Sequence, residues 1–298
     1  MIRLISNLVA YIETYRDYAR SWSGACSMMA HMARGLSGKG VLVVGASAGI
    51  GRAVASKAAR EGAKIAVAAR RREALDNLAR EAGGGTIIVA DLSEPEDCAR
   101  IADEAGTALG KIDVAVFFAA TARLRTLKNM TATEWALTLN TNVVGVNLTI
   151  AGLLPHLSEG ALIIVASSEA AGQPFYALGA YAASKSALED TMRAWRIEQP
   201  DVRFITLVVG TTVPTEFASN FDPQEMVAAF PIWAAQGNAP AEYMQADEVA
   251  DVTVGLIKSL LPNQTVGLEV LSLRSPAPLT GNADTMVETA ATMSPTTT

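Results

Sequence analysis

The chain has 298 residues, of which 50% are hydrophobic and 18% are charged, and its formal net charge is −6. This composition is too apolar for global disorder, and the length allows one or two domains. The acidic balance argues against general nucleic-acid binding, which needs a basic surface. We expect no transmembrane segment, on the interpretation that no apolar run approaches the roughly 18 uncharged residues of a membrane span.

The two cysteines, Cys26 and Cys98, lie far apart, and the chain has two histidines. A disulfide framework and a metal site are therefore not expected. A reducing compartment fits this cysteine usage best, so we expect a cytoplasmic protein.

The two ends of the chain differ in composition from its middle. Residues 1–35 combine apolar residues near helical spacing with an excess of arginine. One interpretation is an amphipathic helix for a membrane surface or a partner subunit. The other is an accessory helix on the protein's own core, or non-native residues added by an upstream start site. Residues 276–298, rich in Thr, Ala, Pro and Ser, are predicted to form a flexible tail.

Between these ends, residues 36–275 alternate short apolar runs with longer helical patterns, which predicts one α/β domain. Apolar runs of this kind are typical of strands buried on both faces, in a doubly wound parallel sheet with helices on both faces. Strands are predicted at Val41–Val44, Ile65–Ala68, Ile87–Ala90, Val114–Phe118, Leu162–Ala166, Phe204–Val209 and Val266–Leu271. Helices are predicted at Gly49–Glu61, Arg72–Ala82, Pro95–Leu109, Thr133–Leu154, Gly179–Glu198 and Asp247–Leu261.

A glycine-rich turn follows the first predicted strand directly and opens the first predicted helix. Its glycines allow a tight turn and a close backbone approach, and the helix N-terminus attracts an anion. This context favours a dinucleotide-binding loop over an ordinary strand-to-helix turn with packing glycines. The candidate cofactor-binding residues are Gly45, Ser47, Ala48, Gly49, Ile50 and Gly51.

The second predicted strand ends at a run of arginines, where a bound adenosine ribose would lie. A cofactor with a free 2′-hydroxyl usually meets an acidic residue there, but this chain has Ala69, Arg70 and Arg71. A guanidinium can hold a 2′-phosphate through its planar fork. We therefore expect NADP(H) to be preferred, with NAD(H) possible. The alternative is that these arginines form a solvated start of the next helix.

A tyrosine and a lysine, Tyr181 and Lys185, lie four residues apart on a predicted helix and therefore share one face. A cation about 5 Å away would lower the pKa of a tyrosine from ~10 by over two units if the site is partly enclosed. Ser168, thirteen residues before Tyr181, follows a predicted strand and could bind a substrate oxygen, with Ser167 as a near competitor.

Taken together, these motifs resemble those of the short-chain dehydrogenase/reductase family in its classical type, and the resemblance covers roughly Lys39 to Ser272. It implies a Rossmann fold and an oxidoreductase that uses a nicotinamide cofactor. It also implies that Asn142 belongs to the catalytic set and that further cofactor contacts come from Asp91, Leu92, Ala119, Ala120, Gly210 and Thr212.

The resemblance further implies a role for each catalytic residue. Tyr181 exchanges a proton with the substrate oxygen, which Ser168 holds. Lys185 lowers the pKa of Tyr181 and binds the nicotinamide ribose. Asn142 holds a water that links Lys185 to solvent, or kinks its helix, or does both. A homodimer or homotetramer is also implied, with the helices at 133–154 and 179–198 as interfaces.

Three departures from the family pattern bear on the site. Phe117-Phe118-Ala119-Ala120 replaces Asn-Asn-Ala-Gly, so Phe118 either narrows the cleft or packs against the sheet. Val209-Gly210 replaces Pro-Gly, where the nicotinamide carboxamide is contacted. The segment from Ser168 to Gly172 is one residue longer than usual.

Residues 213–245 are rich in apolar side chains, and the resemblance implies that this segment closes over the substrate. Either it binds a bulky hydrophobic alcohol or ketone, or its apolar groups pack on the domain or on a neighbouring subunit. The expected function is an NADP-dependent oxidoreductase acting on a carbonyl or secondary alcohol. Alternatives are an epimerase or dehydratase of the same fold, and a dinucleotide-binding regulatory protein with little catalysis.

Overall fold

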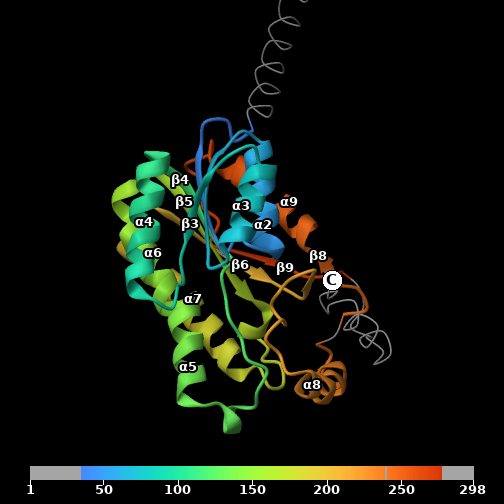
Figure 1. Ribbon diagram of the computed structural model, residues 1–298. Coiled ribbons are helices and arrows are strands. Elements are labelled where there is room, and N and C mark those ends of the chain that lie inside the picture. Colours follow the sequence, from blue (N-terminus) through green and yellow to red (C-terminus); the bar gives the residue numbers. More distant parts are fainter. Residues whose placement is uncertain (1–34, 239, 277–298) are drawn as a thin grey trace, which may run out of the picture.

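The computed structural model describes residues 35–276 except residue 239. The interpretations of the N-terminal extension and of the C-terminal tail therefore lie almost wholly outside the described residues. A seven-stranded sheet, in the order β3-β2-β1-β4-β5-β6-β9, lies between two layers of helices (Figure 1). Every pairing in it is parallel, so the predicted doubly wound α/β fold is confirmed.

The strands follow the predicted apolar runs closely, because a strand covered on both faces must be apolar along its whole length. They are β1 (Gly40–Val44), β2 (Lys64–Ala69), β3 (Thr86–Val89), β4 (Ile112–Phe117), β5 (Leu157–Ser168), β6 (Arg203–Val209) and β9 (Val270–Leu273). The last strand begins four residues later than predicted. Two short strands, β7 (Thr212–Val213) and β8 (Met244–Gln245), pair in a separate small sheet.

The helices also lie where their periodicity predicted them, with one division and one addition. They are α2 (Gly49–Arg60), α3 (Arg72–Glu81), α4 (Pro95–Leu109), α5 (Ala132–Leu139), α6 (Gly145–Leu153), α7 (Gly179–Glu198), α8 (Pro223–Ala235) and α9 (Ala246–Leu260), with short turns η1 (Leu127–Asn129), η3 (Leu154–His156) and η4 (Glu169–Ala171). The predicted helix at 133–154 is divided by a π-helical turn, η2 (Asn140–Val144). Helix α8 was not predicted, because its apolar residues show little helical periodicity.

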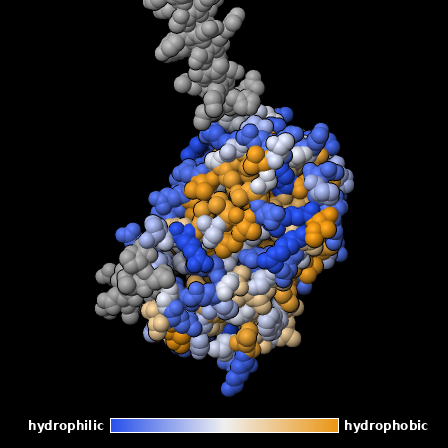
Figure 2. Space-filling view, turned by 180° about the vertical axis from the view of Figure 1, so that it is seen from behind, coloured by the Kyte–Doolittle hydropathy of each residue, from blue (hydrophilic) through white to orange (hydrophobic). Residues whose placement is uncertain are grey.

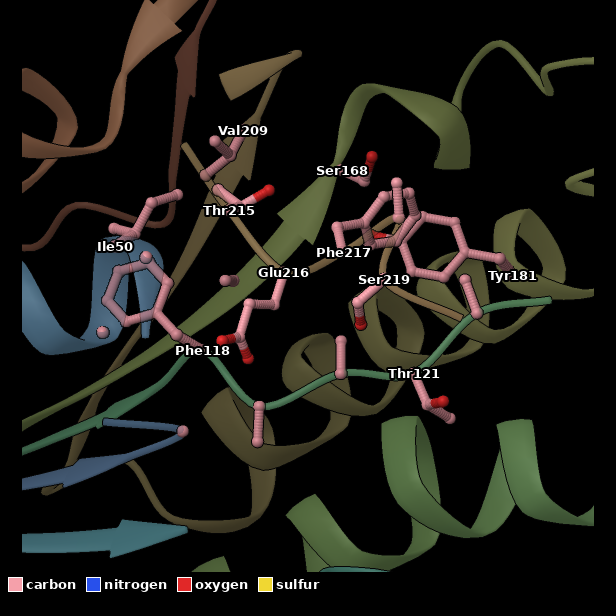
Figure 3. A pocket seen from close by; sticks show the side chains of 18 of the residues that line it. Ile50, Phe118, Thr121, Ser168, Tyr181, Val209, Thr215, Glu216, Phe217 and Ser219 are labelled. Carbon is pink, nitrogen blue, oxygen red and sulfur yellow. The ribbon is translucent and has the colours of Figure 1, made fainter. Parts of the chain in front are cut away.

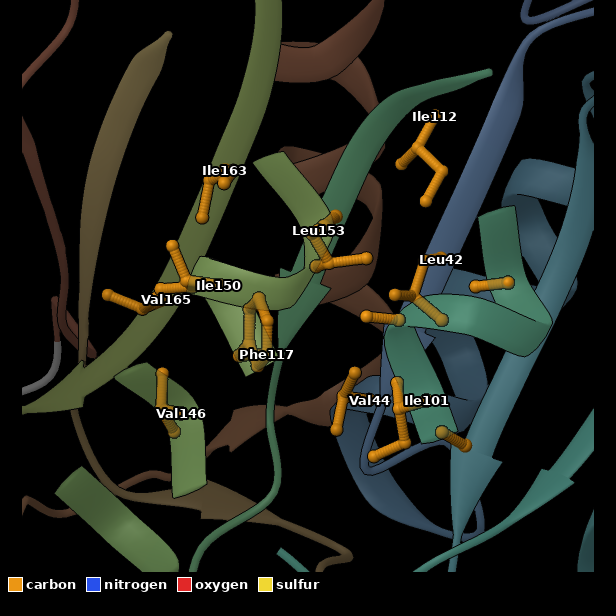
Figure 4. Close-up of a cluster of buried hydrophobic side chains, with 14 of the residues drawn as sticks. Leu42, Val44, Ile101, Ile112, Phe117, Val146, Ile150, Leu153, Ile163 and Val165 are labelled. Carbon is orange, nitrogen blue, oxygen red and sulfur yellow. The ribbon is translucent and has the colours of Figure 1, made fainter. Parts of the chain in front are cut away.

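Each face of the sheet has its own hydrophobic core. On one face, helices α4, α6 and α7 pack over Leu42, Phe117 and Ile163, with Ile101 and Ile150 among the helical contributors (Figure 4). On the other face, α2, α3 and α9 pack over the alternate residues of the same strands. This double coverage excludes water from the strands and leaves their carboxyl ends as the accessible edge.

The stretch Ala132–His156 corrects the expectation about membrane spans. By length and composition this stretch is apolar enough to cross a membrane. In the structure, 44% of its most apolar window is buried inside the protein. Val146, Ile150 and Leu153 from this stretch are fully or almost fully buried in the core beside α4. Core packing therefore accounts for the apolar residues on the buried face of this stretch.

Candidate active site

A cavity of about 390 Å³ lies at the carboxyl ends of the central strands. Doubly wound sheets bind ligands at this edge. Ser168, Tyr181 and Lys185 line it, whereas Asn142 does not. All the predicted cofactor-binding residues also line it, namely Gly45, Ser47, Ala48, Gly49, Ile50, Gly51, Arg70, Arg71, Asp91, Leu92, Ala119, Ala120, Gly210 and Thr212.

The glycine loop between β1 and α2 is packed so closely at Gly45 and Gly51 that no side chain fits at these two positions. A Cβ on Gly45 would lie 2.3 Å from the backbone nitrogen of Ala119, and one on Gly51 would lie 2.3 Å from the carbonyl oxygen of Gly45. No side chain caps the N-terminus of α2. Its first backbone N–H groups are therefore available to an anion, as a pyrophosphate requires.

Two arginines lie at the end of β2, as predicted, but they have different partners. Arg70 is largely exposed, and its Nη1 lies 3.7 Å from Oδ2 of Asp91. Arg71 donates a 3.0 Å hydrogen bond from Nη2 to the hydroxyl of Ser47 in the glycine loop. It also pairs with Glu216 through two contacts of 2.5 Å. Arg71 and Ser47 thus lie within hydrogen-bond distance of each other at the end of the cavity where β2 meets the glycine loop.

Ser168 and Tyr181 meet at the other end of the cavity (Figure 3). Burial raises the pKa of Tyr181 to about 12, and a hydrogen bond with Ser168 opposes this shift. The expectation of a lowered tyrosine pKa is therefore wrong for the chain by itself, because desolvation of the phenolate outweighs the hydrogen bond with Ser168. At neutral pH the phenol is protonated.

Lys185 is also buried, and its ammonium group lies 5.8 Å from the centre of the Tyr181 ring. It donates a 2.7 Å hydrogen bond from Nζ to the carbonyl oxygen of Ala166, at the end of β5. Burial lowers the pKa of Lys185 to about 8, whereas the carboxylate of Glu189 acts to raise it. The lysine therefore titrates close to neutral pH.

The two neighbouring serines have separate roles in the structure. The hydroxyl of Ser167 donates a 2.6 Å hydrogen bond to Glu189. Ser168 is the one that meets Tyr181, and its oxygen also accepts a 3.2 Å hydrogen bond from the backbone of Ala170. This geometry favours Ser168 over its competitor as the group that contacts a substrate oxygen.

Asn142 lies behind the cavity in the π turn, fully buried. Its Oδ1 accepts from the backbone nitrogen of Thr121 at 2.8 Å, and its Nδ2 donates to the carbonyl oxygen of Thr121 at 2.8 Å and to Ser184 at 2.9 Å. The side chain thus fixes the chain after β4 to helix α7. Of the two roles considered for Asn142, the π turn fits the helix kink, and the hydrogen bonds add a structural bridge that was not predicted.

Two of the departures from the family pattern have visible consequences. Phe118 lines the cavity beside Ile50 and also packs on the α2 side of the sheet, so both interpretations of it hold (Figure 3). Glu169, in the longer turn η4, accepts hydrogen bonds of 3.2 Å from the backbone nitrogen and the hydroxyl of Thr211. No sequence signal had marked Glu169 as part of the site.

Residues 210–245, which we call the covering segment, run from β6 to α9 and line much of the cavity. Phe217 lies edge-on to Tyr181 with ring centres 4.9 Å apart, and Phe221 lies 5.3 Å from Phe217. Trp233 of α8 is buried and donates a hydrogen bond to the carbonyl oxygen of Tyr176. The aromatic residues therefore both pack the segment onto the domain and form the cavity wall.

Among the described residues, no group of three or more His, Cys, Asp or Glu side chains could hold a metal ion.

Comparison with known proteins places this fold and site in a family. Residues 39–226 match the family model for short chain dehydrogenase. The chain is 33% identical over 224 residues to 11-beta-hydroxysteroid dehydrogenase 1A of Arabidopsis thaliana, a match covering 68% of this chain and 64% of that protein. It is 37% identical over 169 residues to glycine betaine reductase ATRR of Emericella nidulans, covering 55% of this chain and 13% of that one. The chain thus spans less than two thirds of the length of these curated relatives.

Solved structures give the same result over nearly their whole length. An alcohol dehydrogenase from Thermococcus sibiricus, complexed with 5-hydroxy-NADP, superposes with a TM-score of 0.69 at 28% identity, covering 80% of this chain and 97% of that one. A short chain dehydrogenase from Burkholderia cenocepacia, in complex with NADP, superposes with a TM-score of 0.68 at 27% identity. This match covers 84% of this chain and 99% of that one. The chain belongs to the short-chain dehydrogenase/reductase family of oxidoreductases, as its motifs predicted.

Proposed function

We propose that the protein is an NADP-dependent oxidoreductase that interconverts a carbonyl compound and a secondary alcohol, with Tyr181 as the general acid and base. One observation carries this proposal. A single cavity contains a glycine-rich anion site with Arg70 and Arg71 at one end and Ser168, Tyr181 and Lys185 at the other. A dinucleotide with a 2′-phosphate at its adenosine end has the matching arrangement of charge.

The bound nicotinamide supplies or accepts the hydride. In the direction of reduction, Ser168 donates a hydrogen bond to the carbonyl oxygen and orients it, and Tyr181 transfers its phenolic proton to that oxygen. A buried phenol with a pKa of about 12 holds this proton at neutral pH. Lys185, as the nearest cation, stabilises the phenolate that the transfer leaves behind.

We propose a hydrophobic substrate, because the wall opposite Tyr181 is aromatic. Phe217 and Phe221 line this part of the cavity, with Phe175, Phe230 and Trp233 around them. Apolar surroundings also exclude water, which strengthens the hydrogen bonds that Ser168 and Tyr181 make to a substrate oxygen. The printed names of the Arabidopsis relatives, which are hydroxysteroid dehydrogenases, support a substrate of this kind.

Calorimetric titration with NADPH and, separately, NADH tests the cofactor. Tighter binding of NADPH is expected, and tighter binding of NADH would overturn the preference while leaving the reaction class standing. A panel of hydrophobic ketones with NADPH then tests the reaction. Tyr181→Phe should reduce turnover by roughly 10²–10⁴-fold, the usual contribution of a general acid. If this variant turned over every accepted substrate at the wild-type rate, the proposed role of Tyr181 would be wrong.

We also propose assembly into a homodimer or homotetramer through the region of α5, α6 and α7. Val144 and Leu148, four residues apart in the chain, are 44% and 41% exposed, and Ile197 at the end of α7 is 81% exposed. Separately, the surface seen from behind shows an apolar area bordered by hydrophilic side chains, a kind of surface that another subunit can cover (Figure 2). Light scattering of the purified protein measures the mass, and a monomer at micromolar concentration would contradict this assembly.

A further inference from the structure

The covering segment contacts both ends of the cavity through two consecutive residues. Glu216 pairs with Arg71 at the ribose end, and Phe217 lies against Tyr181 at the catalytic end. The two side chains point in different directions from the segment that carries them (Figure 3). Neither contact was predicted from the sequence, and together they connect the adenosine side of the site to the reacting side.

Glu216 contacts Arg71 in the geometry in which arginine binds an anion. The two terminal nitrogens of Arg71, Nη1 and Nη2, each contact one carboxylate oxygen of Glu216 at 2.5 Å. The same guanidinium donates to the hydroxyl of Ser47 at 3.0 Å. Parallel double hydrogen bonds of this kind are how arginine holds carboxylates and phosphates alike. The carboxylate therefore occupies the anion site that the end of β2 and the glycine loop create.

We infer that Glu216 is a specificity-determining residue that competes with the cofactor's 2′-phosphate for Arg71, so that binding of this phosphate releases the covering segment from Tyr181. The inference rests on the proposed NADP-type cofactor. A phosphate and a carboxylate repel each other and cannot share one guanidinium fork at hydrogen-bond distance. A cofactor without the 2′-phosphate leaves the pair of Arg71 and Glu216 intact.

The strength of the ion pair is suited to such an exchange. The side chains of Arg71 and Glu216 are 48% and 52% exposed, and pairs this exposed are weak. A phosphate carries more charge and three acceptor oxygens, so it can replace the carboxylate. The competition nevertheless opposes phosphate binding, and removal of the carboxylate should strengthen it.

Movement of Glu216 would be transmitted to Phe217 because the segment is fixed elsewhere. Strands β7 and β8 pair at its base, and Arg123 donates a 3.2 Å hydrogen bond to the carbonyl oxygen of Asn220. The part between these attachments carries Glu216 and Phe217. When Glu216 leaves Arg71, this part can move and uncover the phenol of Tyr181 for a substrate.

The test uses two nucleotides that differ only in the 2′-phosphate, adenosine 2′,5′-bisphosphate and AMP. Their affinities are measured by calorimetry for the full-length wild type, for Glu216→Gln and for Glu242→Gln. The last variant makes the same charge change at an exposed position of the covering segment. Hydrogen exchange of the backbone amides at 215–222 is followed in parallel, because it reports on the segment without any catalytic assay.

We expect Glu216→Gln to bind the bisphosphate roughly twofold to fivefold more tightly, with AMP affinity unchanged and Glu242→Gln like the wild type. In the wild type, the bisphosphate should accelerate exchange at 215–222 relative to AMP, whereas Glu216→Gln should exchange fast with either nucleotide.

The other outcomes separate this inference from the proposed cofactor. If the wild type prefers the bisphosphate to AMP but Glu216→Gln changes neither affinity nor exchange, the inference is overturned and the NADP preference stands. If the bisphosphate is preferred only after Glu216→Gln, the competition is supported and the NADP preference of the wild type is overturned. If neither protein distinguishes the nucleotides, both proposals are overturned.

Discussion

The phenol ring of Tyr181 and the phenyl ring of Phe217 lie edge to face, with their centres 4.9 Å apart and their planes inclined by 60°. Tyr181 belongs to helix α7, whereas Phe217 belongs to the covering segment. The contact means that the wall of the substrate space next to the reacting hydroxyl is an aromatic side chain. A substrate must therefore either pack on Phe217 or displace it.

Phe217→Ala is expected to raise the KM for bulky hydrophobic ketones by roughly threefold to tenfold, because an aromatic contact contributes ~0.5–1.5 kcal/mol beyond buried area. Steady-state kinetics with a large and a small ketone measures the effect, which should be smaller for the small one. Val227→Ala is the control, since Val227 on α8 is 74% exposed, and its KM should equal that of the wild type. Equal KM values for Phe217→Ala would show that substrates do not contact this ring.

Lys185 gives a pH dependence of stability whose sign follows from its pKa, which burial lowers from 10.5 to about 8. Between these values, the unfolded chain holds a proton that the folded protein has released, so stability increases as the pH rises. From pH 7 to pH 9.5 this group should add about 2 kcal/mol to the free energy of unfolding.

Urea unfolding of the wild type and of Lys185→Met at both pH values isolates this contribution, because other groups titrate in both proteins. The wild type should gain about 2 kcal/mol more than the variant over this interval. Lys128→Met, at an exposed lysine, should respond to pH as the wild type does. A Lys185→Met protein with the wild-type pH response would contradict the lowered pKa.

Gly51→Ala should disrupt the glycine loop and weaken NADPH binding at least tenfold, because the new methyl group would lie 2.3 Å from the carbonyl oxygen of Gly45. Calorimetric titration measures the loss. Gly255→Ala in α9 is the matched control, since a Cβ there meets nothing within 4 Å. It should leave binding unchanged and stabilise the protein by ~1 kcal/mol through helix propensity. Equal NADPH affinities in the two variants would show that the loop tolerates a side chain.

Asn142→Ala should destabilise the protein by about 1–3 kcal/mol, because it removes hydrogen bonds to Ser184 and to the part-buried backbone of Thr121. Chemical denaturation gives the free energy of unfolding. Asn77→Ala, at a partly exposed asparagine on α3 whose side chain accepts one surface hydrogen bond from Arg80, should change it by less than ~1 kcal/mol. If Asn142→Ala lowered the free energy of unfolding no more than Asn77→Ala does, the hydrogen bonds of Asn142 would contribute little to stability.

The sequence by itself determined the order and the approximate bounds of the parallel strands and of most helices. It also located the glycine loop, the arginines after β2 and the residues Ser168, Tyr181 and Lys185. These features are encoded locally: an apolar run, a glycine where no side chain fits, or a tyrosine and a lysine one helical turn apart. Helix α8 escaped prediction, because its apolar residues have no distinctive helical period. A kink at Asn142 was considered only as one alternative, because the residues around it follow an ordinary helical pattern.

Tertiary structure alone decided the contacts that connect these parts. Arg71 and Glu216 are 145 residues apart in the chain, and no pattern near either residue indicates that the two form an ion pair. The same holds for Phe217 on Tyr181 and for the hydrogen bond of Ser167 to Glu189, which supports the predicted preference for Ser168. The rise in the Tyr181 pKa was also inaccessible, because desolvation depends on everything packed around the phenol, whereas spacing reveals only its neighbouring lysine.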